Sequence, residues 1–246
     1  MSAVCPVTEA IVLAGGLGTR LRGVVPDVPK PMAPVAGRPF LCYVMDHLEA
    51  EGIRRVILAV GYRHRVISEF FGSRYGKLQV DYSIEEQPLG TGGGIALALQ
   101  SVTQPYVFVL NGDSFLRLSY PAMAALAEEP GGAILAVALR MVEDTGRYGR
   151  AVLTGNRISG FHPSGVAGPG FINAGVYLLR SDVFKRYSVP PKFSFETDFL
   201  ESRVSELAPL AFCSDAPFID IGVPEAFRES QMLLPAWTHR QGNSPQ

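Results

Sequence analysis

The chain has 246 residues, of which 47% are hydrophobic and 18% charged, with 26 glycines and 19 prolines. This length and apolar content are enough for one compact domain and exclude a disordered, collagen-like or coiled-coil protein. The 22 basic and 23 acidic side chains give a net charge of -1, so we expect neither nucleic acid nor a membrane surface as a partner.

The first half of the chain alternates short apolar runs with helical patterns. Runs rich in β-branched residues and bounded by Gly, Asn or Arg are typical of buried strands. We expect such strands at 10–14, 56–60 and 106–110, and helices at 40–51 and from 92 to 99. Strand, helix, strand repeats predict a parallel sheet, whose ligands bind at the carboxyl ends of the strands.

The pattern changes after residue 132, where short turns connect successive apolar runs. These runs predict strands at 133–139, 150–154, 157–161 and 171–179, followed by helices at 196–207 and 224–234. Short connections favour mixed or antiparallel pairing. No linker interrupts the chain, so we expect a single domain over 1–234, made of a lobe of 1–132 and a lobe of 133–234, with a frayed tail at 235–246.

The cysteines and the longest apolar stretch limit the cellular setting and the metal chemistry. The stretch 133–139 is far below the ~20 residues that span a bilayer. Cys5, Cys42 and Cys213 are odd in number and widely spaced, which favours a reducing cytoplasm. Because no CxxC or paired-histidine spacing is present, zinc is disfavoured, and a bound metal should have oxygen ligands.

A glycine-rich turn follows the first strand. Gly15, Gly16 and Gly18 allow the backbone N–H groups to approach a polyphosphate, and Thr19 and Arg20 add a hydroxyl and a cation. The spacing fits neither a P-loop nor the dinucleotide fingerprint GxGxxG. Taken alone, the turn is equally compatible with a purely conformational role.

Lys30 is the second candidate. It is one of four lysines in the chain and stands between Pro29 and Pro31, which stiffen the backbone on both sides. We therefore interpret Lys30 as a phosphate-binding cation, the alternative being a solvated loop lysine.

The segment EEQPLGTGGG ends a strand and opens a helix. Free N–H groups at a helix start face a ligand, and Gln87 offers the donor and the acceptor that reading a base edge requires. The alternative is that these glycines only permit close packing.

Two aspartates follow apolar strand residues. Asp113 ends VFVLNGD and Asp220 lies within PFIDIG. An unpaired carboxylate at a strand end is typical of a cation site, so we expect both to hold Mg²⁺ with substrate phosphates completing its coordination. Asp113 as a cap of the following segment is the alternative.

The motifs LAGGLGTRL, PKPM, EQPLGTGGG, LNGD, INAGVYLL and FIDIGVPE occur in this order over about residues 9 to 234. Together they resemble the sugar-1-phosphate nucleotidyltransferases, and most closely the D-glycero-α-D-manno-heptose 1-phosphate guanylyltransferases, which make GDP-heptose for surface polysaccharides. The resemblance implies an α/β fold, a Rossmann-like (glycosyltransferase-A-like) three-layer sandwich with a mixed central sheet. It also makes 1–132 a nucleotide-binding lobe and 133–234 a sugar-binding lobe.

The resemblance assigns a role to each matching residue. It implies nucleotide binding by Leu13, Ala14, Gly15, Gly16, Gly18, Thr19, Arg20, Gln87 and Gly92; sugar binding by Gly112, Asn173, Ala174, Gly175 and Glu196; Mg²⁺ binding by Asp113 and Asp220; and catalysis by Arg20, Lys30 and Asp113. Read without the resemblance, Asn173 is a turn residue and Glu196 is an acid at a helix N-terminus.

The implied reaction is a direct displacement with no covalent enzyme intermediate. A phosphate oxygen of the sugar 1-phosphate attacks the α-phosphorus of GTP, and pyrophosphate leaves. Mannose 1-phosphate with GTP, or N-acetylmuramate or glucose 1-phosphate with UTP or dTTP, are alternative substrates. A non-catalytic nucleotide-sugar-binding regulator is a further alternative, and a homo-oligomer is left open.

One departure from the family pattern concerns the sugar phosphate. Many relatives carry Glu-Lys after the Phe of the central strand, with the lysine meeting this phosphate, but here Pro163 and Ser164 occupy those positions. Arg147, Arg150 or His162 could replace the lysine, or Mg²⁺ could carry more of the charge.

Overall fold

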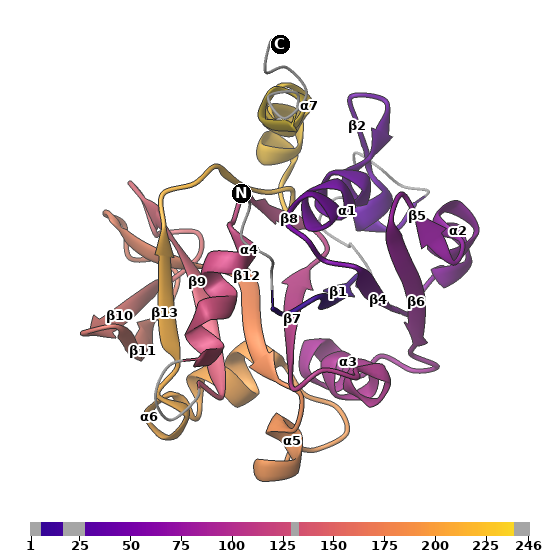
Figure 1. Cartoon of the computed structure of the whole chain (residues 1–246). Helices are drawn as coiled ribbons and strands as arrows, with labels where there is room; N and C mark the ends of the chain where they lie inside the picture. Colours follow the sequence, from indigo (N-terminus) through magenta and orange to yellow (C-terminus); the bar gives the residue numbers. More distant parts are fainter. Residues whose placement is uncertain (1–5, 17–27, 129–132, 239–246) are drawn as a thin grey trace, which may run out of the picture.

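The computed structural model describes residues 6–16, 28–128 and 133–238. Within these ranges ten strands form one sheet in the order β10-β11-β13-β9-β12-β7-β1-β4-β6-β5 (Figure 1). Its strands are β1 (Glu9–Leu13), β4 (Arg55–Val60), β5 (Arg74–Tyr75), β6 (Leu78–Ile84), β7 (Tyr106–Asn111), β9 (Leu135–Val142), β10 (Arg150–Thr154), β11 (Arg157–His162), β12 (Gly170–Arg180) and β13 (Leu210–Ser214). Two small pairs join β2 (Pro34–Val35) to β3 (Arg38–Pro39), and β8 (Ser114–Leu116) to β14 (Phe218–Asp220).

Helices cover both faces of the large sheet. They are α1 (Phe40–Ala50), α2 (His64–Phe71), α3 (Gly90–Ala98), α4 (Tyr120–Ala124), α5 (Val183–Arg186), α6 (Val204–Leu207) and α7 (Pro224–Thr238), with short 3-10 turns η2 (Lys30–Met32), η3 (Leu99–Ser101) and η4 (Ala125–Glu128) and a π-helical turn η5 (Phe195–Glu201). Figure 1 shows α1 and α7 on one side of the sheet and α3 and α5 on the other.

Successive side chains of the central strands face opposite sides of the sheet, and this alternation creates the three layers. On β1, Val12 faces the core formed with α1, whereas Ile11 faces the core formed with α3. Both side chains are fully buried, because a strand between two helical layers has no solvent face. The expected three-layer α/β sandwich is therefore confirmed.

The sheet is mixed, as expected, and its parallel half has one functional edge. β1 pairs in parallel with β4 and β7, and β4 with β6. β12 runs antiparallel to both β7 and β9. The carboxyl ends of β1, β4, β6 and β7 consequently meet at one edge, where loops from all four strands converge.

Two expected helices differ from the structure. The helix predicted at 196–207 is instead the π-helical turn η5 followed by the separate helix α6; the widened turn buries Phe195, Phe199 and Leu200 together. Helix α7 continues to Thr238, four residues past the boundary predicted at 234. Its last turn is held because Trp237 stacks on Phe115, with ring centroids 6.3 Å apart. Residues 239–246 lie outside the described ranges.

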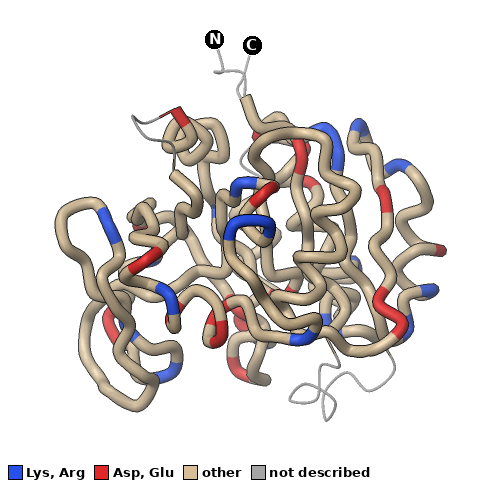
Figure 2. Tube along the Cα trace, turned by 90° about the horizontal axis from the view of Figure 1, so that it is seen from below, with Lys and Arg blue, Asp and Glu red and all other residues tan. Residues whose placement is uncertain are grey.

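Positive and negative residues are interspersed along the described trace (Figure 2). Many are neutralised locally, as in the ion pairs Arg38–Asp46 at 2.8 Å and Arg180–Asp182 at 3.0 Å. Helices in the described ranges are all too short or too polar to cross a bilayer.

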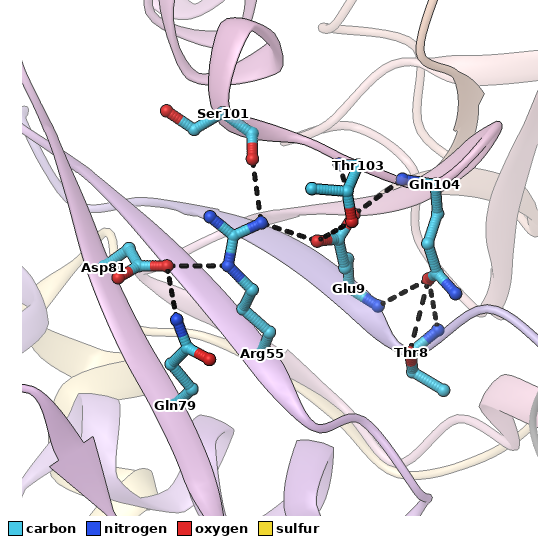
Figure 3. Close-up of polar contacts among 8 residues, drawn as sticks. All are labelled: Thr8, Glu9, Arg55, Gln79, Asp81, Ser101, Thr103 and Gln104. Atoms are coloured by element: carbon cyan, nitrogen blue, oxygen red, sulfur yellow. Dashed lines mark hydrogen bonds and ion pairs between the residues drawn. The ribbon is translucent and has the colours of Figure 1, made fainter.

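The opposite edge of the parallel half is fixed by a buried carboxylate (Figure 3). Glu9, which is 3% exposed, accepts hydrogen bonds from Arg55 at 2.5 Å and from the backbone N–H groups of Thr103 and Gln104 at 2.8 and 2.9 Å. Arg55 also donates to Asp81 at 2.6 Å. These contacts join the starts of β1, β4 and β6 to the segment before β7.

The Glu9 carboxyl should stabilise the fold in a pH-dependent way. Burial raises its pKa, but the hydrogen bonds from Arg55, Gln104 and Thr103 outweigh burial and leave the pKa below its ordinary 4.5. A carboxyl with a lowered folded-state pKa stabilises the protein above its unfolded-state value, and this contribution disappears as the pH falls through the folded-state pKa.

We expect Glu9→Gln to lower the free energy of unfolding at pH 7 by about 1.5–3 kcal/mol, the range for hydrogen bonds to a charged group. Urea unfolding at pH 7 and at steps below pH 4.5 measures the effect, and the difference from the unmodified chain should shrink in acid. Glu225→Gln is the matched control, because Glu225 pairs with Arg228 on an exposed helix surface and such pairs contribute roughly 0–1 kcal/mol. Equal losses in both variants would contradict the role of Glu9.

Candidate functional site

A cavity of about 990 Å³ opens at the carboxyl edge of the parallel strands. Its lining combines the loops that follow β1, β4, β6 and β7. The lining residues from these loops include Leu13, Gly15, Gly16, Gly61, Tyr62, Glu85, Glu86, Asn111 and Asp113, and Lys30, Thr91 and Gly222 lie in the same wall. The volume suits a ligand of nucleotide size, since ordinary ligand pockets span roughly 300–1,000 Å³.

Two glycines in the loop after β1 have different surroundings: Gly15 is packed against the backbone, and Gly16 is open. A Cβ at Gly15 would lie 3.1 Å from the backbone nitrogen of Gly61, so this position is tight. A Cβ at Gly16 would meet nothing within 4 Å. The N–H of the buried Ala14 donates to the carbonyl of Ala59 at 2.8 Å, and of the described residues of the turn Gly16 is the exposed one. Gly18, Thr19 and Arg20, to which the sequence assigns the triphosphate, lie outside the described residues.

Lys30 is held in place and is not a solvated loop lysine. It opens the 3-10 turn η2 between two prolines, and its side chain is 14% exposed. Its Nζ lies 2.5 Å from Oδ2 of Asp113 and 3.7 Å from Oδ1 of Asp220. The expectation that Asp113 is unpaired is therefore wrong, since an ammonium group already occupies the position facing its carboxylate.

The small sheet β8–β14 brings the two aspartates together. Asp220 pairs in register with Ser114, the residue after Asp113, and the N–H of Ile221 donates to the carbonyl of Asp113 at 3.1 Å. The two carboxylates thus converge on one ammonium, although they come from opposite halves of the chain.

The donor set fits a hard cation that completes its coordination with substrate oxygens. No group of three or more His, Cys, Asp or Glu able to hold a metal is found in the described ranges. Asp113 and Asp220 supply carboxylate oxygens only, and the ammonium between them shows that this point favours positive charge. Mg²⁺ is commonly held by one or two carboxylates together with phosphate oxygens, so the residues present fit that ion.

The glycines of the segment 90–94 mainly permit close packing. Helix α3 begins at Gly90, and the N–H of Gly92 donates to the carbonyl of Phe193 at 3.0 Å. A Cβ at Gly92 would overlap the ring of Phe193. The expectation that N–H groups at this helix start are free to meet a ligand therefore fails at Gly92, because Phe193 already accepts its hydrogen bond. Gln87 is exposed between Glu86 and Pro88, which both line the cavity.

The segment to which the sequence assigns the sugar coincides with an irregularity of β12. Asn173 pairs with Leu139 on β9, but the register then shifts and resumes at Tyr177. Gly175 lies inside this bulge with φ of +72°, a conformation that glycine adopts without strain. Bulges are frequent beside active sites, and this one includes the buried Ala174.

A chain of hydrogen bonds connects the bulge to the cavity wall. Asn173 donates to the hydroxyl of Tyr177 at 3.0 Å, and that hydroxyl donates to Oε1 of Glu196 at 3.2 Å. Thr91 in the cavity wall donates to Oε2 of Glu196 at 2.6 Å. Burial first, and then the Glu196 carboxylate, raise the pKa of Tyr177 well above its ordinary value, so its hydroxyl remains a donor.

Gly112 holds two strand ends together. Its N–H donates to the carbonyl of Leu13 at 2.9 Å, and a Cβ there would lie 2.5 Å from the same oxygen. The structure therefore places Gly112 between β1 and β7, where a larger residue would separate the loops that carry Gly16 and Asp113.

Sequence reasoning missed the apolar side of the cavity. Tyr62 and Ile84 line it and are 49% and 47% exposed, which is unusual for large apolar side chains. Ile84 pairs in register with Val60 at the end of β4, two residues before Tyr62. His64 also lines the cavity, and its Nδ1 is buried without a hydrogen-bond partner in the described part of the chain. The available signal was their position at the ends of parallel strands, since Tyr62 and His64 follow β4 and Ile84 ends β6.

A family model described as nucleotidyl transferase matches residues 9–236. The chain belongs to the nucleotidyl transferase family. It is 42% identical over 226 residues to the D-glycero-alpha-D-manno-heptose 1-phosphate guanylyltransferase of Aneurinibacillus thermoaerophilus, covering 92% of this chain and 98% of that protein. The protein of the same name from Campylobacter jejuni is 40% identical over 220 residues, which cover 89% and 96% of the two chains.

Solved structures agree with this family assignment. HddC from Yersinia pseudotuberculosis matches with a TM-score of 0.82 at 33% identity, covering 94% of this chain and all of that one. A second crystal structure of HddC, complexed with GMP-PN, matches with a TM-score of 0.81 at 34% identity, covering 92% of this chain and 98% of that chain. The expected family and the glycosyltransferase-A-like fold are both confirmed.

Two glycine variants separate a packing role from a ligand-facing role. We expect Gly92→Ala to lower the free energy of unfolding by about 1–3 kcal/mol, the usual cost of overpacking, because its Cβ overlaps Phe193. Gly16→Ala should change stability by less than about 0.5 kcal/mol and should weaken nucleotide binding, because its Cβ projects into the open cavity. Urea unfolding and nucleotide titration of both variants measure this, and a destabilised Gly16→Ala would contradict the assignment.

Proposed function

We propose that this enzyme transfers a guanylyl group from GTP to D-glycero-α-D-manno-heptose 1-phosphate, giving GDP-heptose and pyrophosphate. The observation that carries the proposal is the ammonium of Lys30 between Asp113 and Asp220 at the wall of a nucleotide-sized cavity. The sequence identity of 40–42% to two heptose 1-phosphate guanylyltransferases supports the choice of base and sugar.

In the proposed reaction two anions must meet. A phosphate oxygen of the sugar 1-phosphate attacks the α-phosphorus of GTP, and the bond from that phosphorus to the oxygen bridging it to the β-phosphorus breaks. Pyrophosphate leaves with the bond electrons. Because the attacking oxygen is already ionised, no general base is needed, and the protein contributes positioning and charge stabilisation.

Asp113 and Asp220 would hold Mg²⁺, which when bound supplies positive charge to the phosphate oxygens. Lys30 lies within reach of both carboxylates and is positioned to exchange them for substrate phosphates. The prolines on both sides of Lys30 limit how far its backbone can move when the side chain makes this exchange. We assign triphosphate binding to Gly18, Thr19 and Arg20 on the sequence pattern alone.

On the sugar side, the bulge of β12 presents polar groups that are partly used within the protein. Asn173 donates one amide N–H to the hydroxyl of Tyr177, and its Oδ1 accepts a hydrogen bond from the N–H of Gly175; both distances are 3.0 Å. One N–H and one lone pair of its amide remain. With Glu196, which Tyr177 and Thr91 hold in place, these groups would bind sugar hydroxyls. The proposal thus keeps 1–132 as the nucleotide-binding lobe and 133–234 as the sugar-binding lobe.

The proposed setting is the cytoplasm, as a step in surface polysaccharide synthesis, since Cys42 and Cys213 are both free thiols and free thiols persist in a reducing compartment.

The substrate assignment is tested by pyrophosphate release in the presence of Mg²⁺. We expect the highest kcat/KM for GTP with D-glycero-α-D-manno-heptose 1-phosphate in a panel of five nucleoside triphosphates and of heptose, mannose, glucose and N-acetylmuramate 1-phosphates. A different maximum would replace the substrate and keep the mechanism. Absence of turnover in a folded protein that binds GDP-heptose would favour a regulatory role instead.

Lys30→Ala and Asp113→Asn should each lower kcat by about 10²-fold or more, the usual effect of losing one group that stabilises transition-state charge. Circular dichroism should show that the large sheet and its helices are retained, because both side chains lie at the cavity wall and the Lys30 contacts are local to the small sheet β8–β14. Lys77→Ala is the matched control, since Lys77 is an exposed turn lysine before β6. Near-normal rates in either site variant would contradict the assigned roles.

A further inference from the structure

We infer that Arg147 binds the phosphate of the sugar 1-phosphate and is a catalytic residue of this enzyme; the inference rests on the proposed function. The supporting observation is a row of alternating charges beside the cavity, formed by Lys30, Asp220 and Arg147. Arg147 Nη2 lies 2.6 Å from Oδ2 of Asp220, whose other oxygen lies 3.7 Å from the Nζ of Lys30. Two cations from opposite lobes therefore share one carboxylate.

The guanidinium of Arg147 lies next to Gly222, a residue of the cavity wall. A Cβ at Gly222, which lines the cavity, would be 3.2 Å from Nη2 of Arg147. The guanidinium carbon lies 4.8 Å from the centre of the Tyr148 ring, and that ring packs edge-on against Phe218 of β14. The aromatic contacts guide the arginine stem toward the end of β14, where Asp220 begins the turn.

The loop that carries Arg147 packs on the segment where the sequence departs from the family pattern. The N–H of Gly165 donates to the carbonyl of Gly146 at 2.7 Å, and a Cβ at Gly149 would lie 3.4 Å from the backbone nitrogen of Ser164. A cation extending from position 147 thus begins next to Pro163–Ser164. Pro163 and Ser164 carry no positive charge, and Arg147 on the neighbouring loop supplies one beside them.

The other two candidate cations are placed differently. Arg150 packs its aliphatic stem against Gly170, and on the edge strand β10 it pairs in register with His162 of the neighbouring strand β11. In the described ranges neither Arg150 nor His162 forms an ion pair. Of the three candidates for the missing cation, Arg147 is the one in contact with the carboxylates of the site.

The chemistry of the guanidinium suits this role. Arginine presents five N–H donors in a planar fork that matches phosphate oxygens bidentately. Among the described residues its contact with Asp220 uses Nη2 alone, and the side chain is 35% exposed, so within that part of the chain further donors are available to a ligand. A second cation on the sugar side would offset the repulsion between two anionic substrates, as Lys30 does on the nucleotide side.

Steady-state kinetics and direct titration of the full-length protein test the assignment. We expect Arg147→Ala to raise the KM for D-glycero-α-D-manno-heptose 1-phosphate at least tenfold and to lower kcat/KM about 10²-fold, with the KM for GTP within twofold. Arg147→Lys should restore part of the loss, because the charge remains and the fork does not. Titration of the metal-free protein with the sugar phosphate should show the same loss of affinity.

Arg186→Ala is the matched control, because Arg186 is an exposed arginine paired with one carboxylate, Asp182 at 3.0 Å, on α5. Arg150→Ala and His162→Ala test the competing cations. A large rise in the sugar phosphate KM in either of them, with a normal Arg147→Ala, would overturn the inference. The inference would also be overturned if Arg147→Ala changed only the Mg²⁺ concentration that gives the half-maximal rate. Arg147 would then act through Asp220.

The unmodified enzyme separates failure of this inference from failure of the proposed function. Turnover of the heptose phosphate by the unmodified enzyme and equally by Arg147→Ala would overturn the role of Arg147 and leave the proposed function standing. Absence of turnover by the unmodified enzyme with every sugar 1-phosphate would overturn both. If another sugar 1-phosphate is turned over, the same KM shift is expected for that compound, and its absence would overturn the inference.

Discussion

The ammonium group of Lys30 balances two carboxylates from opposite halves of the chain, and the geometry of the site depends on this contact. Without a cation between them, Asp113 and Asp220 would repel each other at the place where β8 and β14 must pair. In the proposed reaction the same charge also meets the substrate phosphates. Structural and functional demands therefore fall on a single side chain, which explains why prolines fix it on both sides.

The central strands and the position of the site could be predicted from the sequence because their signals are local. The β-branched runs of β1, β4 and β7 are short, fully apolar and bounded by polar residues, as strands buried on both faces must be. A lysine between two prolines is equally visible. The pairing of Asp113 with Lys30 could not be predicted, because it depends on where the turn η2 lies relative to the end of β7. Contacts of this kind are set by tertiary structure.

Glycines show a second limit of sequence reasoning. Gly16 and Gly92 both belong to glycine-rich turns at strand ends, yet the first faces open space and the second lies against Phe193. The difference comes from the segment before η5, more than a hundred residues away from Gly92 along the chain, which no local pattern reveals. The break between η5 and α6 was missed for a related reason, since burial of Phe195, Phe199 and Leu200 on one side widens the helix locally.

The bulge in β12 has a consequence for how substrate preference can change. Residues 174–176 lack partners on β9 in the ladder of this strand, so in the proposed sugar site the groups that they would offer on that side belong to the main chain. A side-chain replacement leaves such groups in place, whereas an inserted or deleted residue shifts all of them at once. Divergence in sugar choice at this stretch should therefore proceed through changes of length, and enzymes with unlike residues here can retain one preference when the length is kept.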